Sequence, residues 1–278
     1  YPQAEMNRVI GKQVVAVLAM SVAASTGAAP TGISAPDVAL RADLQRVTTQ
    51  RIYFGHQSVG ANLLDGIREL SVQAGFPIQI TEVNSVNNIN QPFLGHSFVG
   101  ENGNPHGKLK QFDQVIGPAA SGLNVAMVKF CYVDFTPDTD VKALFASYRN
   151  TIDSIKARNP AITIIHITTP LTDVQAGPKA FIKRLLGRAP YGVLENIRRQ
   201  EYNNLLRKTY HGREPIFDLA QIESTEPDGT ASTAEWNGSK IPKLTATYTD
   251  DGGHLNNIGR QRAARELVSV LASPRGQR

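Results

Sequence analysis

The chain has 278 residues, of which 41% are hydrophobic and 19% are charged, and its formal net charge is +5. This length and composition predict one domain with a substantial core, and they exclude general disorder. The Lys and Arg residues are scattered, without a long basic run or interleaved aromatics, so we expect no nucleic-acid partner. An acidic polysaccharide or an anionic membrane surface would suit the mild positive charge.

Residues 1–36 are predicted to be an N-terminal extension that contains a secretory signal peptide. Basic Arg8 and Lys12 precede the apolar run "VVAVLAMSVAA" at 14–24, and small residues with a proline follow. This order is typical of a signal peptide, and the run is too short to span a bilayer comfortably. The alternative is an apolar first helix of the fold. We therefore expect a secreted or periplasmic protein with no integral membrane segment in its mature chain.

The first half of the remaining chain alternates predicted strands and helices. The predicted elements are a linker or short helix at 37–49, a strand at 51–54, a helix at 58–74, a strand at 78–83 and a short helix at 109–116. Between the last two, residues 84–107 are rich in Asn and Gly and are predicted to form a long loop. Loops of this length in a compact domain are often functional.

Two continuous apolar runs, at 124–133 and 161–171, are typical of strands buried on both faces. The amphipathic pattern of 138–158 predicts a helix between them. The later elements are a basic insertion at 172–190, a helix at 191–210, a strand at 215–220, an irregular stretch at 223–249 and a final helix at 256–272. Alternating strands and helices predict a parallel sheet covered on both faces, which binds ligands at the carboxyl ends of its strands.

Three residues that could form a nucleophilic triad fall at this edge of the sheet. Ser58 follows the first predicted strand in "GHQSVG", and Asp251 and His254 lie three residues apart in "DGGHLNNIG", just before the last helix. A serine nucleophile needs a base, and the base needs an orienting carboxylate. Taken singly, Ser58 could be a plain helix N-cap and His254 a surface turn residue.

These two blocks resemble those of the SGNH, or GDSL, hydrolases, in which the nucleophile follows the first strand and Asp-x-x-His precedes the last helix. The resemblance spans roughly residues 51–272, and Gln57 stands where the family usually has Asp. It implies a flavodoxin-like three-layer α/β/α sandwich with a parallel sheet, and one catalytic domain over 37–278. It also implies Ser58 as nucleophile, His254 as base and Asp251 as the partner of that base. The G-x-S-x-G elbow of α/β-hydrolases fits less well, because His56 replaces its first glycine.

The resemblance further implies an oxyanion hole made by the nucleophile's backbone N–H, a glycine N–H after the second strand and an asparagine after the third. Gly95, Gly100 and Gly103 are candidates for the glycine, of which we favour Gly100. The family's Gly-x-Asn-Asp falls on "CYVD" at 131–134, where Val133 has no side-chain donor.

Tyr132, Asn102 or His56 is then expected to supply the missing donor. We place Gln57 with these three among the substrate-binding residues. The alternative for His56 is a structural hydrogen bond at the end of the first strand.

No metal or cofactor is expected. The histidines at 96, 106, 166 and 211 show no metal-ligand spacing with a nearby acid. The single cysteine, Cys131, excludes an intrachain disulfide and is interpreted as a packing residue. Asp134 and Thr169-Pro170 are expected to line the pocket.

We expect a serine esterase that hydrolyses O-acyl esters, with acetyl groups on carbohydrate as the favoured substrate. The first alternative is a polysaccharide O-acetyltransferase that uses the same triad. The second is a non-catalytic carbohydrate-binding protein on the same fold.

Overall fold

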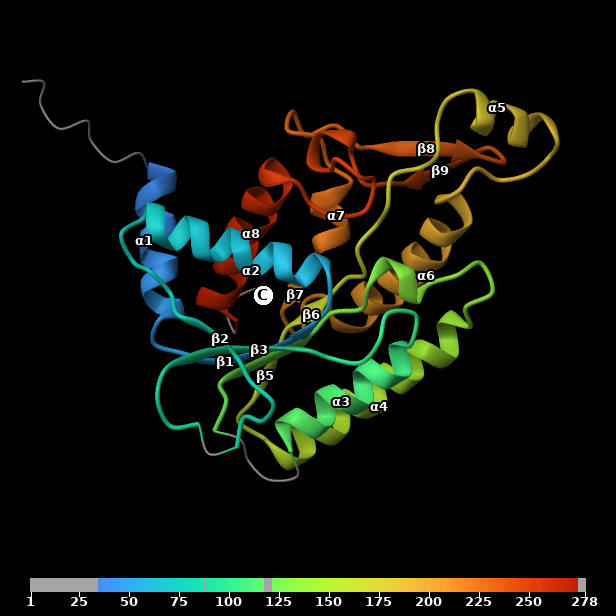
Figure 1. Ribbon diagram of the computed structural model, residues 1–278. Coiled ribbons are helices and arrows are strands. Elements are labelled where there is room, and N and C mark those ends of the chain that lie inside the picture. Colours follow the sequence, from blue (N-terminus) through green and yellow to red (C-terminus); the bar gives the residue numbers. More distant parts are fainter. Residues whose placement is uncertain (1–34, 88, 118–121, 275–278) are drawn as a thin grey trace, which may run out of the picture. The chain divides into compact units, whose positions relative to one another are not determined.

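A five-stranded parallel sheet with the order β2-β3-β1-β4-β5 forms the centre of the domain in the computed structural model (Figure 1). The structure describes residues 35–87, 89–117 and 122–274. The strands are β1 (Arg51–His56), β2 (Ile80–Glu82), β3 (Phe93–Phe98), β4 (Val125–Val128) and β5 (Thr163–Ile164). A second parallel pair consists of β6 (His166–Ile167) and β7 (Ile216–Phe217). Only Ile165 separates β6 from the end of β5.

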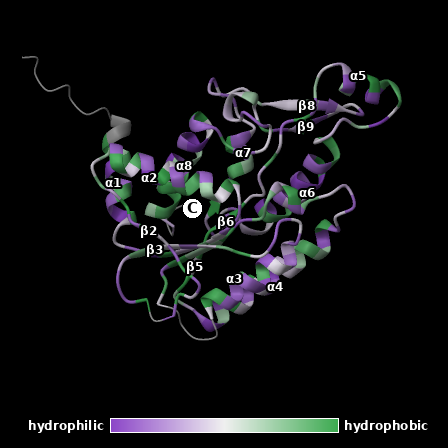
Figure 2. Cartoon of the chain, viewed as in Figure 1, coloured by the Kyte–Doolittle hydropathy of each residue, from purple (hydrophilic) through white to green (hydrophobic). Residues whose placement is uncertain are grey.

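Helices cover both faces of the sheet and make two hydrophobic cores. One face carries α1 (Ala35–Val47), α2 (Val59–Gln73) and α8 (Asn257–Ala272), and the other carries α3 (Pro105–Ile116), α4 (Val141–Arg158) and α6 (Val193–Tyr210). Alternation along β1 sends Ile52 and Phe54 into the first core and Tyr53 into the second. In Figure 2 green hydrophobic residues lie along β5 and β6, and the helices carry both green and purple residues. The predicted three-layer α/β/α sandwich is confirmed.

The prediction of a long loop over 84–107 is wrong, because β3 lies within it and fills a central position between β1 and β2. Its sequence, "FLGHSF", contains Gly, His and Ser, which give little strand signal on their own. Hydrogen bonds from the strands on both sides stabilise it instead. Apart from the edge strand β2, the order β3-β1-β4-β5/β6-β7 is that of flavodoxin-like folds.

Four other segments differ from the prediction in detail. The expected strand at 161–171 is split, because Ile165 N–H bonds to Ala126 of β4 while His166 N–H bonds to Pro215 before β7. The remaining three are the basic insertion, which contains α5 (Pro178–Leu185); the strand expected at 215–220, which is shortened to β7 because α7 (Leu219–Glu223) begins within that range; and the irregular stretch, which contains the hairpin β8 (Thr233–Trp236) and β9 (Ser239–Pro242). At 37–49 the short-helix alternative holds, as α1.

The predicted signal peptide falls on residues that the structure does not describe, so it stays a prediction. In the described ranges, no helix has both the length and the apolar character needed to cross a membrane.

Helices α2 and α8 pack closely where Gly66 of α2 meets α8. A Cβ at Gly66 would lie 2.7 Å from the Ala264 Cβ and 2.7 Å from the Arg260 carbonyl oxygen. Arg260 also pairs with Glu69 across this contact. The sequence-distant turns that begin α2 and α8 are therefore held beside each other.

Candidate active site

Ser58 lies in a strained turn between β1 and α2. Its backbone has φ 46° and ψ −106°, a conformation that residues with a side chain rarely adopt. Its hydroxyl makes no capping bond to α2, so the N-cap interpretation is wrong. Instead, Ser58 Oγ lies 2.5 Å from His254 Nε2, across 196 residues of sequence. Strained backbone of this kind is concentrated at functional sites.

His254 is oriented by Asp251 within one short turn. Its Nδ1 lies 2.6 Å from Asp251 Oδ2, while Asp251 Oδ1 accepts the backbone N–H groups of His254 (2.8 Å) and Gly253 (2.9 Å). The backbone hydrogen bond from His254 and the imidazole itself hold the pKa of this carboxyl well below its usual range. Because a carboxylate only accepts, Nδ1 carries the hydrogen and Nε2 is left to accept from Ser58.

The loop that carries Asp251 and His254 is fixed from both sides. Asp173 N–H donates to the Gly252 carbonyl oxygen at 2.8 Å, and Leu255 N–H donates to Asn62 Oδ1 of α2 at 3.3 Å. The second bond links the start of α8 directly to the helix that follows Ser58. The triad geometry is therefore set by the packing of α2 against α8.

Tyr132 is brought to the triad, and its ring lies edge-on to the His254 ring at 5.7 Å between centroids. Gly253 has no room for a side chain, because a Cβ there would lie 2.9 Å from the Tyr132 hydroxyl. The buried Arg199 guanidinium holds the backbone of Tyr132, since its Nε and Nη2 donate to the Tyr132 carbonyl oxygen at 3.0 and 2.8 Å. In contrast, the side chains of His254 and Asp251 are 44% and 57% exposed, so the site is open to solvent.

The assignment of Gly100 as an oxyanion donor is contradicted by its hydrogen bonding. Its N–H already donates to Gln111 Oε1 at 2.6 Å. Its carbonyl oxygen accepts from Gln57 Nε2 at 2.8 Å, and the Val99 carbonyl oxygen accepts from the same nitrogen at 3.4 Å, so both hydrogens of the Gln57 amide are used within the protein. Both residues instead tie the turn after β3 to the turn that carries Ser58.

The assignment of His56 to the oxyanion or the substrate is also wrong, because its side chain is completely buried. His56 Nε2 lies 3.0 Å from His96 Nδ1, and the rings of Phe54 and Phe98 pack around it. Gly60 supplies the space, since a Cβ there would lie 2.4 Å from the His56 Cβ. Burial, with His96 and Lys129 nearby, lowers the pKa of His56 to about 3, so the ring is neutral. His56 thus has the structural role at the strand end.

With His56 excluded, Tyr132 and Asn102 remain as candidates for the donor that Val133 lacks, and Asn102 is the one of the two with a side-chain amide. Its Oδ1 accepts from Lys108 Nζ at 3.2 Å, which leaves its amide Nδ2 as a donor on the exposed turn after β3. Lys108 in turn pairs with Asp134 at 2.6 Å, and both of these side chains are fully buried. The sequence predicted that Asp134 lines the pocket. Its side chain is instead buried, where it accepts from Lys108 and from the Gly103 N–H and so holds this turn in place.

A buried polar cluster lies behind the turn at 131–134. The sequence analysis did not predict the charged residues of this cluster. The signal that could have found them is Lys129, a charged residue inside the otherwise apolar run 124–133. Lys129 Nζ donates to the Phe130 carbonyl oxygen at 2.9 Å and contacts the Cys131 sulfur at 3.7 Å. Burial raises the pKa of the nearby Glu223 to about 8, so this carboxyl is largely protonated at neutral pH. Buried Cys131 is a packing residue.

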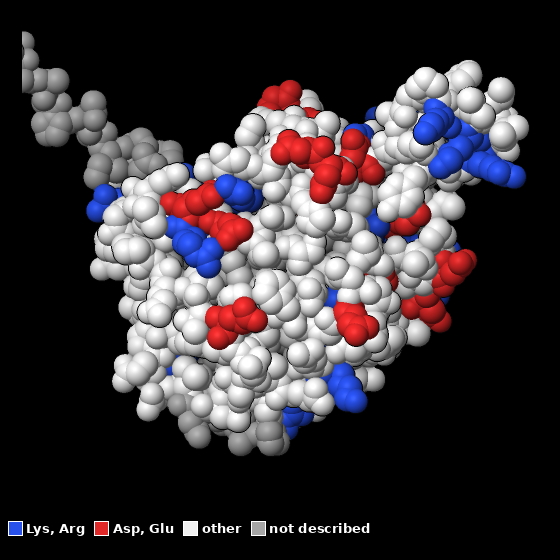
Figure 3. All heavy atoms as spheres, in the orientation of Figure 1, with Lys and Arg blue, Asp and Glu red and all other residues white. Residues whose placement is uncertain are grey.

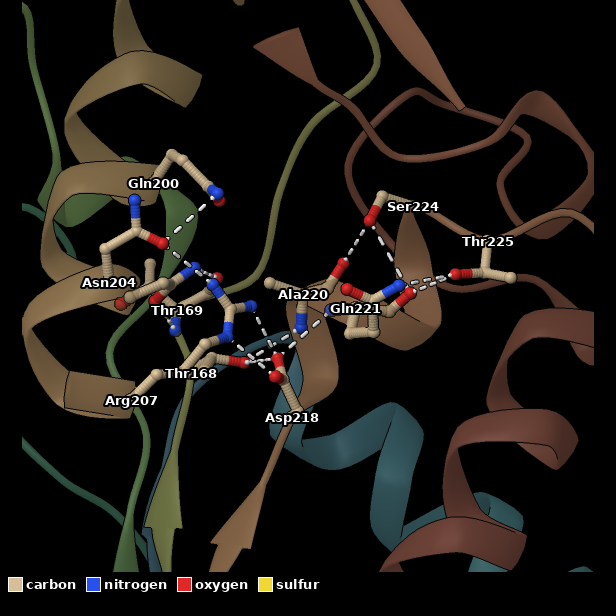
Figure 4. A network of polar contacts seen from close by, with 11 residues as sticks. Thr168, Thr169, Gln200, Asn204, Arg207, Asp218, Ala220, Gln221, Ser224 and Thr225 are labelled. Carbon is tan, nitrogen blue, oxygen red and sulfur yellow. Dashed lines mark hydrogen bonds and ion pairs between the residues drawn. The ribbon is translucent and has the colours of Figure 1, made fainter. Parts of the chain in front are cut away.

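A second polar cluster, at the carboxyl ends of β6 and β7, contains none of the triad residues. In Figure 4 the side chains of Thr168, Arg207 and Asp218 point toward one another. Asp218 accepts from Arg207 Nε at 2.7 Å and from Thr168 Oγ1 at 3.1 Å, and it caps α7 through the Gln221 N–H. This cluster therefore ties α6 to α7.

Within the described ranges, no group of three or more His, Cys, Asp or Glu side chains is placed to hold a metal ion.

No family model matches the chain, and no curated protein matches it. Solved structures similar to it include a GDSL-like lipase from Bacteroides thetaiotaomicron, at 12% identity over 85% of this chain and 98% of that chain, with a TM-score of 0.47. Another is the periplasmic domain of a Salmonella ser. Paratyphi A lipopolysaccharide acetyltransferase, at 15% identity over 80% and 83% of the two chains, with a TM-score of 0.41. At these scores, function is inferred from the geometry of the site alone.

Replacing His56 by Ala is expected to lower the free energy of unfolding at neutral pH by roughly 2–4 kcal/mol, because it opens a cavity in the core. The pKa of about 3 lies below the ordinary 6.5, so the folded state binds this proton less readily than the unfolded state. The wild-type protein should therefore lose stability as the pH falls from about 6.5 to about 3, and His56→Ala should lose less over that window.

Urea unfolding of both proteins across this pH range measures the difference. His106→Ala, which removes an exposed histidine, is the control and should keep the wild-type profile. A His56→Ala profile parallel to the wild type would contradict the structural role of the neutral ring.

Proposed function

We propose that the chain is a serine ester hydrolase that cleaves O-acyl esters with Ser58 as nucleophile, His254 as base and Asp251 as its orienting carboxylate. One observation carries the proposal: Ser58, held in a strained turn, presents Oγ 2.5 Å from His254 Nε2, and His254 Nδ1 lies 2.6 Å from the Asp251 carboxylate. This is the geometry of an activated serine.

In this mechanism Ser58 Oγ attacks the carbonyl carbon of the ester while its proton passes to His254 Nε2. The tetrahedral intermediate collapses when His254 returns that proton to the leaving alkoxide, and the acyl group stays on Ser58. A water molecule then attacks the acyl-enzyme, with His254 again taking and returning a proton. Asp251 keeps the imidazole oriented and stabilises its charged form in both halves of the reaction.

The developing oxyanion would be bound at the start of α2 and by Asn102. In the described part of the chain, the Ser58 backbone N–H donates to no protein group, and the N-terminus of α2 favours negative charge. Asn102 Nδ2 is a side-chain donor that the turn after β3 offers, since its Oδ1 is held by Lys108. We therefore assign these two groups to the oxyanion.

We favour acetyl groups on carbohydrate as the substrate, and a secreted or periplasmic location for the protein. The open position of His254 and Asp251 supports an ester carried on a large molecule, because such a site does not require the substrate to be enclosed. The sequence order at 1–36 supports export, and the net charge of +5 suits an acidic polymer.

Acyl transfer to a sugar hydroxyl is a second candidate, which the same exposure of His254 favours. A base that is 44% exposed can activate a bulky acceptor hydroxyl as readily as water at the acyl-enzyme stage. The protein, incubated with p-nitrophenyl acetate and an oligosaccharide, is expected to release free acetate. Mass spectrometry of the oligosaccharide detects acyl transfer as an acetylated product. More acetylated oligosaccharide than free acetate would favour the transferase.

Ser58→Ala and His254→Ala are each expected to lower kcat for p-nitrophenyl acetate by roughly 10⁴-fold or more, because each removes a group that acts directly in the transition state. Asp251→Asn should lose less, since the base survives without its orientation.

A fluorophosphonate probe, followed by peptide mass spectrometry, should label Ser58 in the wild type. Ser239→Ala, at an exposed serine of β9, should retain both activity and labelling. Full activity in purified Ser58→Ala would sink the mechanism, and absent labelling of the wild type would favour a non-catalytic binding protein.

Asn102→Ala is expected to lower kcat by about 10²-fold with little change in KM, as for the loss of one oxyanion donor. Asn102→Asp is the matched variant, since it keeps an acceptor for Lys108 but removes the donor. Steady-state kinetics and melting temperatures of both variants make the test. A loss of stability with normal kcat would show that Asn102 only supports the turn.

A further inference from the structure

Helix α5 presents its apolar side to solvent. Phe181, Ile182, Leu185 and Leu186 are 68%, 54%, 76% and 65% exposed, whereas Ala180 on the opposite side is buried. An amphipathic helix normally turns its apolar side to the core. Here the orientation is reversed, and the helix stands beside β8 and β9 at the outside of the domain (Figure 1). In Figure 2 this segment carries both green and purple residues.

Basic residues flank this apolar side, with no acidic residue among them. The segment 176–190, "AGPKAFIKRLLGRAP", contains Lys179, Lys183, Arg184 and Arg188 and no Asp or Glu. Figure 3 shows the blue side chains gathered on this projection. In the described part of the chain none of the four pairs with a carboxylate, although Lys183 Nζ donates to Gln175 Oε1 at 2.7 Å.

We propose that α5 and its flanking basic residues dock on the surface of an anionic lipid bilayer. The four exposed apolar side chains would enter the boundary between headgroups and acyl chains, and the Lys and Arg side chains would contact lipid phosphates. This combination of an exposed apolar stripe and unpaired basic residues is that of an interfacial helix.

A second copy of this chain fits the surface less well. In a symmetric contact the same four basic residues would face their copies, and like charges at close range oppose association. One eight-residue helix also offers much less than the ~800 Å² per partner that a specific interface usually buries. An anionic bilayer satisfies both the apolar and the charged groups.

Docking at α5 would bring the active site close to the lipid surface. The segment that leads into α5 contacts the triad loop, since Asp173 N–H donates to the Gly252 carbonyl oxygen at 2.8 Å. Residues of α5, including Phe181 and Arg184, line a groove with Thr233 and Lys243 of the β8–β9 region. This inference concerns the place at which the protein works, and it stands whether or not the triad hydrolyses esters.

Co-sedimentation with vesicles of phosphatidylcholine containing phosphatidylglycerol, and of phosphatidylcholine alone, tests the proposal. The full chain should bind the anionic vesicles more tightly, and Phe181→Ser with Leu185→Ser should weaken that binding roughly tenfold or more. Lys179→Gln with Arg188→Gln should weaken it about tenfold and reduce its salt sensitivity.

Val38→Ser with Val72→Ser is the matched control, since it removes two exposed apolar side chains outside α5. Residues 1–36 are the same in all the proteins compared. It should bind as the wild type does, and all variants should keep wild-type melting temperatures and activity on soluble p-nitrophenyl acetate. Equal binding by wild type and the Phe181/Leu185 variant would overturn the proposal. So would equal binding to both kinds of vesicle, or a wild-type dimer in gel filtration that only the Phe181/Leu185 variant dissociates.

Discussion

The close packing of α8 on α2 is the contact on which the geometry of the candidate site depends. Gly66 permits it, since any side chain there would press on Ala264 and on the Arg260 carbonyl oxygen. The contact sets the start of α8 beside the start of α2, so that residues 196 positions apart lie within hydrogen-bond distance. A displacement of either helix would separate Ser58 from His254 without altering any residue of the triad, and catalysis by a triad is sensitive to such distances.

Buried polar groups hold the turns around this contact. Lys108 of α3 and Asp134 form a fully buried ion pair, Asp134 also accepts from the Gly103 N–H in the turn after β3, and Arg199 donates to the carbonyl oxygen of Tyr132. A buried ion pair contributes little net stability compared with apolar packing, but removing one partner leaves a charge without compensation. These contacts therefore act mainly by restricting the turns to one arrangement, which keeps Tyr132 beside His254.

The two histidines near Ser58 show how environment separates chemical roles. His254 is solvent-accessible, with its Nδ1 on the Asp251 carboxylate and its Nε2 on Ser58 Oγ. His56 is only two residues from Ser58, yet burial keeps it neutral and its Nε2 is hydrogen-bonded to His96. Proximity in sequence to the nucleophile therefore says little about function, because His56 ends β1 with its side chain in the packed interior, whereas Ser58 lies beyond the strand in a turn with positive φ.

The alternation of strands and helices, the three-layer class and the three residues that meet, Ser58, His254 and Asp251, could all be predicted from the sequence. Those inferences depend on local periodicity and on the rule that parallel strands end at a common edge. The sequence did not predict that β3 is a central strand, that the Gly100 N–H is bonded to Gln111, that His56 is buried, or that the apolar side of α5 faces outward. Each of these depends on partners distant in the chain, which a window of neighbouring residues does not contain.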